Sequence, residues 1–476
     1  MTTPTTSTGS YADRYLCSAV HLSDGFAGYV LGVLTGDSLD ALGPSPGMDL
    51  VALARHADLA VTRHRRQHGL LAGVLAGTLA LALPVLVAGG ETAAPLLIMV
   101  LLGAWIAGFT VLLVHRLDGY RRALAVRDDP AQPRDLAPPL DGATEAYLAS
   151  VMTSNVVVFS GGEPFVGSGA LLARWKLNIN CTRPASAGTA VRPFTAADLH
   201  KDLTLAARRT GIPGLDVHNR LFVAGTAAGT VPGLHPDPMN RPLTTVSSAA
   251  LRAGIVQPQP TTRTYLCLRK VSWGGDLVVE VFVRVERTAA YLFVEHHAFV
   301  LLPLRAELCV AAYLPSNVAW RVVLRSVTGT LGELLRSPGA LLRDARGTAR
   351  RARAANRQRK QARRSPIYDY GAGSGLRSDA ASPERIGLFQ YADEDRDLGI
   401  LRQAMLESIF DFLSTHGIDT SEFTRQQTSI VNQSISIGSI TNGNTVIGAN
   451  GTVVQQPSAA VPGQPTAAPW APAAIP

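Results

Sequence analysis

The sequence has few cysteines and few charged residues for its length. Its 476 residues contain four cysteines, Cys17, Cys181, Cys267 and Cys309, which are widely spaced and form no CxxC pair. This pattern encodes neither a disulfide framework nor a zinc site, and it fits a reducing compartment. Charged residues make up 17% of the chain, whereas soluble domains contain roughly 25%. Together with 46% hydrophobic residues, this deficit indicates that part of the chain lies outside water.

Two stretches contain no ionisable side chain. Residues 70–90 and 95–114 are each about 20 residues long, enough for a helix to cross the roughly 30 Å hydrocarbon core of a bilayer. A soluble helix normally keeps a polar stripe, and neither stretch has one. We therefore predict a transmembrane helical hairpin at 69–115, with the lipid bilayer as its partner. Because no acid or base lies inside either span, an anchor is favoured over a transporter.

Arginines indicate the orientation of this hairpin. They flank both of its outer ends: Arg63, Arg65, Arg66, Arg116, Arg121 and Arg122. The connection between the spans contains Glu91 and no basic residue. Since Lys and Arg are retained on the cytoplasmic side, we expect a two-span protein of the cell membrane with both termini in the cytoplasm.

The segments beside the hairpin differ in composition. Residues 1–68 are predicted to form an N-terminal helical segment in the cytoplasm, with a helix capped by Ser23. A turn at 43–47 precedes a second helix, which begins near Met48 and continues toward the membrane. On the other side, proline and charged residues indicate a linker at 116–139.

The main domain is predicted at 140–336. At 277–285 every odd position is apolar, whereas Glu280 and Arg284 occupy the other face, which predicts a half-buried antiparallel strand. Further elements are expected as strands at 155–160, 174–180, 263–273 and 291–302, a hairpin turn at 273–276, and helices at 196–210 and 317–335. The expected fold class is therefore an α+β cytosolic domain attached to a two-helix transmembrane hairpin, with a disordered C-terminal tail.

A glycine-rich loop at 161–169 is the most motif-like feature of this domain. Its candidate ligand-binding residues are Gly161, Gly162, Gly167, Ser168 and Gly169. Such loops cradle phosphate when they end a strand and open a helix. Here no GK[ST] follows and the next segment resembles a strand, so a structural turn is favoured over a ligand loop.

No catalytic residue, metal site or cofactor is predicted. His296 and His297 are adjacent on a strand and point to opposite faces, so they cannot both bind one ion.

The next predicted segment is a basic and Gly/Ser-rich linker at 337–392, and its first part is a basic stretch. Residues 343–364 contain ten Lys or Arg and one acid. The candidate contacts with a polyanion or membrane surface are Arg350, Arg351, Arg353, Arg357, Arg359, Lys360, Arg363 and Arg364. Anionic lipid headgroups, nucleic acid and plain solvent are the three alternatives. No aromatic side chain interleaves these charges, which disfavours binding to single-stranded nucleic acid.

The last predicted unit is 393–454. Residues 393–416 carry one apolar stripe, which predicts an amphipathic helix that ends at Gly417. Residues 428–454 alternate small polar and β-branched side chains around Asn-Gly pairs. They predict a short hairpin, or an edge strand that pairs with a second copy in a homo-oligomer. The Pro/Ala-rich residues 455–476 are expected to be a disordered tail.

Five short blocks carry a resemblance to a known group of proteins: residues 14–17, 44–47, 164–169, 368–371 and 416–423. Together they resemble a set found in uncharacterised, high-GC actinobacterial membrane proteins with two spans. The resemblance implies a family without an assigned activity, and it supplies no catalytic residues.

The sequence thus favours a membrane-anchored, cytoplasm-facing protein that binds or scaffolds partners. Two alternatives stay open. One is a membrane-associated enzyme that uses the loop at 161–169, and the other is a nucleic-acid binder that uses residues 343–364.

Overall fold

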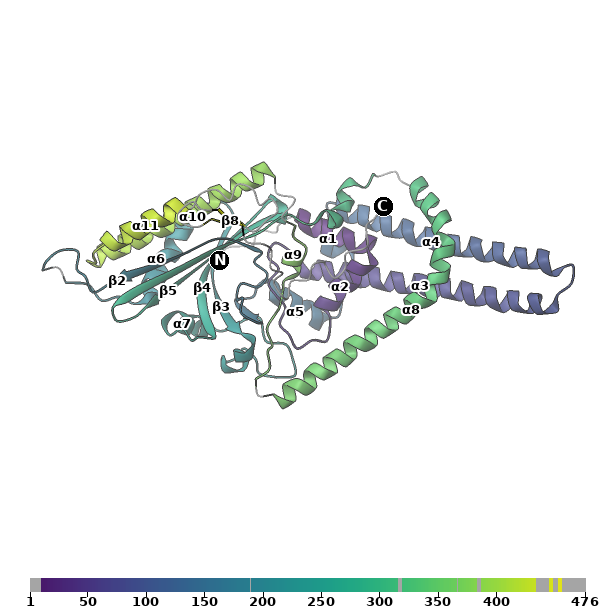
Figure 1. The fold of residues 1–476 in the computed structure, drawn as a ribbon, viewed down its shortest axis with the longest axis horizontal. Coiled ribbons are helices and arrows are strands. Elements are labelled where there is room, and N and C mark those ends of the chain that lie inside the picture. The colour runs from purple at the N-terminus through teal and green to yellow at the C-terminus, as the bar shows by residue number, and fades with distance from the viewer. Residues whose placement is uncertain are drawn as a thin grey trace.

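The computed structural model describes residues 10–188, 190–315, 319–365, 367–382, 387–433, 445–447 and 453–455. Three parts follow one another along the long axis of the molecule: a helical hairpin, a helical base and a sheet domain (Figure 1). The hairpin consists of α3 (Leu50–Ala88) and α4 (Ala93–Asp128). Its far half projects alone from the rest of the molecule (Figure 1).

The hairpin confirms the two predicted apolar helices. Both are long and apolar enough to cross a membrane, with best 18-residue windows of mean hydropathy 2.4 and 2.6. Only 6% and 11% of the residues in those windows are buried. α3 is a single helix from Leu50, as expected, and the Asp49 carboxylate accepts from the backbone N–H groups of Val51 and Ala52. α4 continues to Asp128, so much of the expected linker at 116–139 is helical. Ala123 and Val126 on this extension are buried in the base.

The helical base holds the inner ends of α3 and α4 together with α1 (Tyr11–Leu22), α2 (Asp24–Leu34) and α5 (Gly142–Met152). α1 and α2 meet at an angle of 117°. Ser23 lies between them and accepts from the backbone N–H of Phe26, which confirms the predicted cap. α1 was not predicted as a separate helix, and it begins because Ser10 accepts from the N–H of Asp13.

The sheet domain confirms the predicted α+β class. Its strands are β1 (Val156–Phe159), β2 (Ala170–Asn180), β3 (Leu215–Ala224), β4 (Thr262–Ser272), β5 (Leu277–Arg287) and β6 (Tyr291–Leu301). They are ordered β1-β3-β4-β5-β6-β2, and only the β1–β3 pair is parallel. Its helices are α6 (Ala196–Arg209), α7 (Ser248–Val256), α10 (Leu388–Thr415) and α11 (Ser421–Gln433). One face of the sheet shares a large apolar core with α6, α10 and α11.

The prediction that β5 is half-buried was wrong. Its odd positions join the apolar core, but Glu280 and Arg284 on the other face are only 2% and 6% exposed. Arg269 Nε on β4 donates to Glu280 over 2.7 Å, and Arg284 Nε donates to Glu295 on β6 over 3.1 Å. Because each charge has a partner on a neighbouring strand, this polar face can be buried.

The segment after the sheet is one long helix, α8 (Ala319–Arg364), which passes through Pro338. The predicted helix at 317–335 therefore continues into the basic stretch. The expected strand region at 428–454 is helical as far as Gln433 in α11. Beyond it, β7 (Thr445–Ile447) and β8 (Val453–Gln455) pair antiparallel, as in the predicted short hairpin. The predicted tail lies, after Gln455, outside the described residues.

The remaining short elements connect these parts. They are η1 (Pro133–Leu136), η2 (Gly225–Thr230), η3 (Trp273–Gly275), η4 (Ala306–Leu308), η5 (Val310–Tyr313) and α9 (Leu376–Asp379). η3 is the predicted hairpin turn, and it joins β4 to β5.

Candidate functional site

Three loops meet between the base and the sheet, and we call this place the loop junction: residues 43–47, 164–169 and 371–379. Their backbones approach closely at glycines. A Cβ added to Gly167 would lie 2.2 Å from the Pro44 carbonyl oxygen, and one added to Gly375 would lie 2.5 Å from the same atom. A Cβ on Gly43 would lie 2.1 Å from the Ser374 oxygen. Only glycine allows this packing, so these loops are fixed to one another.

The glycine-rich loop therefore has a structural role at its second half. Gly167 and Gly169 have φ of +81° and +90°, and a Cβ on Gly169 would lie 2.2 Å from the Val300 oxygen. Ser168 is 4% exposed. Gly161 and Gly162 are exposed instead, and a Cβ on either would meet nothing within 4 Å in the described structure.

Phe165 explains why this loop is held against the sheet. The centroid of its ring lies 4.7 Å from the ring centroid of Phe282. It lies 5.0–5.3 Å from the ring centroids of Phe222, Tyr265 and Phe299. The loop then enters β2 and opens no helix. It therefore lacks the helix N-terminus that phosphate loops use, and its use as a ligand site stays a prediction.

The segment after α8 ties the junction to β1. The Ala372 N–H donates to the Val158 carbonyl (2.9 Å), and the Ser160 N–H donates to the Ala372 carbonyl (3.0 Å). The Ser160 hydroxyl donates to Asp369 over 2.6 Å. Residues 44–47, 164–169 and 368–371, which are three of the blocks that carry the resemblance, thus lie in one connected region.

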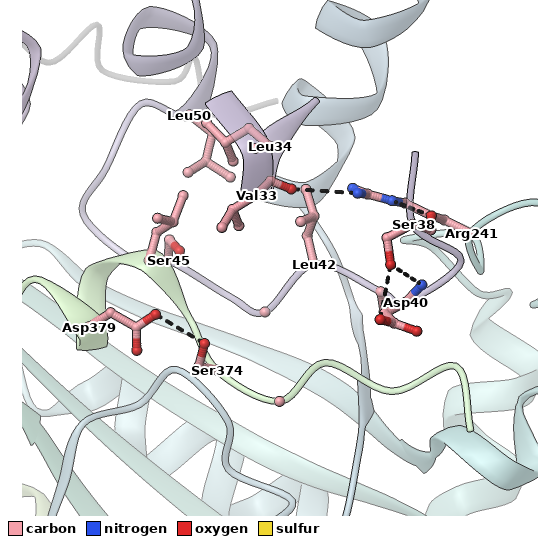
Figure 2. Close-up of a pocket in the computed structure, with 15 residues that line it drawn as sticks. Val33, Leu34, Ser38, Asp40, Leu42, Ser45, Leu50, Arg241, Ser374 and Asp379 are labelled. Carbon is pink, nitrogen blue, oxygen red and sulfur yellow. Dashed lines mark hydrogen bonds between the residues drawn. The ribbon is translucent and has the colours of Figure 1, made fainter. Parts of the chain in front are cut away.

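A cavity of about 240 Å³ lies beside the junction, between the end of α2 and the loops at 38–45 and 373–379 (Figure 2). Asp379 accepts from the Tyr29 hydroxyl (2.8 Å) and from Ser374 (3.0 Å). Arg241 donates to the carbonyls of Gly36 (2.8 Å) and Ser38 (3.0 Å). No histidine or cysteine is among the described residues that line it.

The cavity is smaller than typical ligand pockets, which start at about 300 Å³. Its polar side chains already bind other protein groups, as the bonds from Arg241 to the Ser38 carbonyl and from Ser374 to Asp379 in Figure 2 illustrate. Burial and the neighbouring Asp379 raise the pKa of Tyr29, so this hydroxyl stays protonated. These bonds hold the segments around the cavity together and stabilise the junction.

Arg377, which sequence reasoning missed, belongs to the junction loop 371–379 and is fully buried. Its Nη2 donates to the carbonyls of Asp276 (2.9 Å), Leu302 (2.9 Å) and Gly275 (3.2 Å). Burial lowers its pKa to about 10, which leaves it charged at neutral pH. It joins the β4–β5 turn to the end of β6, and a lone arginine in a Gly/Ser-rich segment carries no sequence signal of such a role.

A histidine cluster, also missed, lies where the hairpin enters the base. His21 Nε2 lies 2.9 Å from His56 Nδ1, and His115 Nε2 lies 3.0 Å from His64 Nδ1. His64 Nε2 lies 2.6 Å from an Asp24 oxygen. Burial lowers the pKa of His21 to about 2, so it packs as a neutral ring. Among the described residues no group of three or more His, Cys, Asp or Glu could hold a metal ion.

The basic candidates lie on the second half of α8. All are exposed except Arg359, which is partly buried and pairs with Asp37 over 2.5 Å. Gln358 donates to Asp40 over 3.1 Å in the same place. This half runs obliquely back past the base, away from the hairpin (Figure 1). Its contact with lipid or nucleic acid stays a prediction.

Comparison with known proteins gives one match. The model of the AbeC-like domain family matches residues 174–454, from β2 to β8. This region holds five of the six sheet strands with α8, α10 and α11, whereas the hairpin and most of the base lie before it. Neither a curated protein nor a solved structure matches the chain. Since the matched region is more than half of the chain, the protein belongs to the AbeC-like domain family.

Proposed function

We propose that this protein is a membrane-anchored binding or scaffold protein that holds its AbeC-like domain at the cytoplasmic face of the cell membrane. The observation that carries the proposal is the exposed apolar surface of the hairpin. Leu83, Val87, Ile98 and Met99 are each at least 66% exposed. Large exposed apolar patches mark contacts with a membrane or another protein, and the length and hydropathy of the two helices favour a bilayer.

The arginines at the base support the cytoplasmic orientation. Arg63 donates to the His21 carbonyl over 2.7 Å and lies 3.7 Å from Asp118. Arg116 donates to the Arg325 carbonyl over 2.7 Å. Charges fixed in the base in this way resist transfer across the membrane.

Close contacts between the base and the sheet support a scaffold role. A Cβ added to Gly275 of the β4–β5 turn would lie 2.9 Å from the Gly47 carbonyl oxygen, and one added to Gly47 would lie 3.3 Å from the Val278 side chain. Asp49, which caps α3, also pairs with Arg134 over 2.9 Å. Because α3 itself continues into the hairpin, the anchor sets the orientation of the sheet domain to the membrane.

We further propose that the chain comes from the high-GC actinobacterial branch suggested by its short sequence blocks. The two alternative functions have less support. Gly167 and Gly169 are accounted for by packing, and the end of the basic stretch pairs with Asp37 and Asp40.

Cysteine labelling tests the orientation. Glu91→Cys lies between the spans, and Ala354→Cys lies on the exposed second half of α8. A membrane-impermeant maleimide applied to intact cells should label Glu91→Cys alone, and Ala354→Cys only after permeabilisation. The reverse pattern would contradict the proposed orientation.

The binding role is tested with the full-length protein purified in mild detergent. We expect one partner, or a second copy of the chain, to co-purify at a fixed ratio in light scattering and mass spectrometry. Gly162→Asp is a useful comparison, because this exposed position tolerates a side chain. Partner binding should survive this change, whereas a phosphate-binding enzyme would lose its ligand. A monomer that recovers no partner would contradict the scaffold proposal.

A further inference from the structure

The first half of α8 exposes the side chains that a helix in water would bury. Residues 320–342 carry large apolar side chains on one side: Trp320, Leu324, Val327, Leu331, Leu335 and Leu342. Trp320, Leu331 and Leu335 are each 63–64% exposed. A helix on a soluble protein normally turns such a stripe toward the core.

The opposite arrangement holds on the side that faces the protein. Ser326, Thr330 and Ser337 are fully buried, and each hydroxyl donates to a carbonyl of α8 itself. Leu334 packs on Gly108 of α4, where a Cβ would lie 2.8 Å from it. Small polar residues and Leu334 thus make the helix contact, and the other large apolar side chains are left outside.

α8 also has a third, charged side. Successive residues of an α-helix are rotated by about 100° around its axis. By this geometry Arg321, Arg325 and Arg336 lie together on one side of α8. That side is about 100° around the axis from the exposed apolar side chains. A helix with adjacent apolar and basic sectors is typical of the interface between acyl chains and headgroups.

The position of α8 fits that interface. Its first half crosses α3 and α4 where the hairpin leaves the base (Figure 1). It meets α4 at Gly108, near the end of the predicted span, and at Arg116, just beyond it. The exposed apolar side of α8 therefore lies beside the apolar hairpin, and it includes Trp320, a residue type that membrane proteins enrich at the membrane–water interface.

We propose that residues 320–342 form an interfacial helix that lies in the plane of the membrane and is covered by the acyl chains of one leaflet. The bilayer is then bound at three places, the two spans and this helix. The helix sets the depth of the base, and the basic second half of α8, from Arg343 onward, leaves the membrane surface. This inference rests on the membrane anchoring proposed above.

Fluorescence quenching in reconstituted vesicles tests it. Leu335→Cys and Arg336→Cys are adjacent exposed positions on different sides of α8, and Leu102→Cys on α4 reports on the span. Each full-length variant is labelled with an environment-sensitive probe and placed in vesicles of phosphatidylcholine and phosphatidylglycerol, with or without acyl-chain-brominated lipid. The four native cysteines are buried, and the unsubstituted protein controls for their labelling.

We expect several-fold stronger quenching at Leu335→Cys than at Arg336→Cys, and quenching at Leu102→Cys of similar strength. Leu331→Cys, on the same side as Leu335, guards against a local disturbance and should behave alike. Quenching at Leu102→Cys without quenching at Leu331→Cys and Leu335→Cys would overturn the interfacial helix alone. Absence of quenching at all of these positions would overturn the membrane anchoring as well.

Discussion

At the scale of single residues, buried polar groups hold the parts of the molecule together. Arg377 binds three carbonyls, and Glu280 and Arg284 each pair with a neighbouring strand. Burial raises the pKa of Glu280, but the charges of Arg269 and Arg220 outweigh it and keep the pKa below its usual value. None of these roles could be predicted from the sequence, because nothing local marks a charged residue as buried, and the carbonyls that Arg377 binds are also distant in the chain.

Arg377→Met should destabilise the protein by about 3 kcal/mol or more, because three buried carbonyls lose their donor. Thermal unfolding of the purified protein in detergent measures the change. Arg350→Met, at an exposed position of α8, is the matched control and should change stability by less than about 0.5 kcal/mol. Equal effects of the two substitutions would contradict the role given to Arg377.

Glu394 on α10 should make stability depend on pH. Burial, with the nearby Asp395, raises its pKa from 4.5 to about 7. Between these two pKa values the folded state holds a proton that the unfolded state has lost. The stability that comes from the protonated Glu394 is therefore complete below pH 4.5 and is lost as pH rises through 7.

Glu394→Gln should remove this dependence on pH. The difference in the free energy of unfolding between the variant and the native protein should therefore change by about 2 kcal/mol between pH 5 and pH 8. Unfolding is measured at both pH values. Glu407→Gln, at an exposed site on the same helix, controls for loss of a carboxylate. A difference in the free energy of unfolding between Glu394→Gln and the native protein that is the same at both pH values would contradict the raised pKa.

At the scale of elements, periodic patterns predicted the hairpin helices, five strands, α6 and α10 because such patterns are local. β3 was missed, since Asp216, His218 and Arg220 interrupt its apolar run. The length of α8 was missed because proline usually ends a helix, yet Pro338 lies inside this one. The loop at 161–169 was recognised as unusual, but its packing on Pro44 depends on a contact across more than a hundred residues.

Gly167→Ala should therefore destabilise the loop junction, because its Cβ would meet the Pro44 oxygen and its φ is positive. We expect a loss of about 2–4 kcal/mol. Gly162→Ala has open space and no positive φ, and it should be nearly neutral. Hydrogen exchange over residues 41–47 and 368–379 shows whether the loss is local, and protection unchanged by Gly167→Ala would contradict the packing.

At the scale of the whole molecule, one helix connects the apolar hairpin with the base beside the sheet domain. α3 begins at Leu50, after the Asp49 cap and near the β4–β5 turn, and ends in the apolar hairpin. The resemblance and the AbeC-like match are complementary, because the match covers the sheet domain and α8 whereas the sequence blocks also include the base. The molecule thus joins an AbeC-like domain to two helices that are long and apolar enough to span a membrane.

Membrane fractionation tests the central claim most directly. Cells that express the full-length protein are lysed without detergent, and their membranes are washed with alkaline carbonate and sedimented at high speed. Two spanning helices should keep the protein in the pellet until detergent is added. Recovery of the folded protein in the supernatant would contradict the membrane anchor and everything built on it.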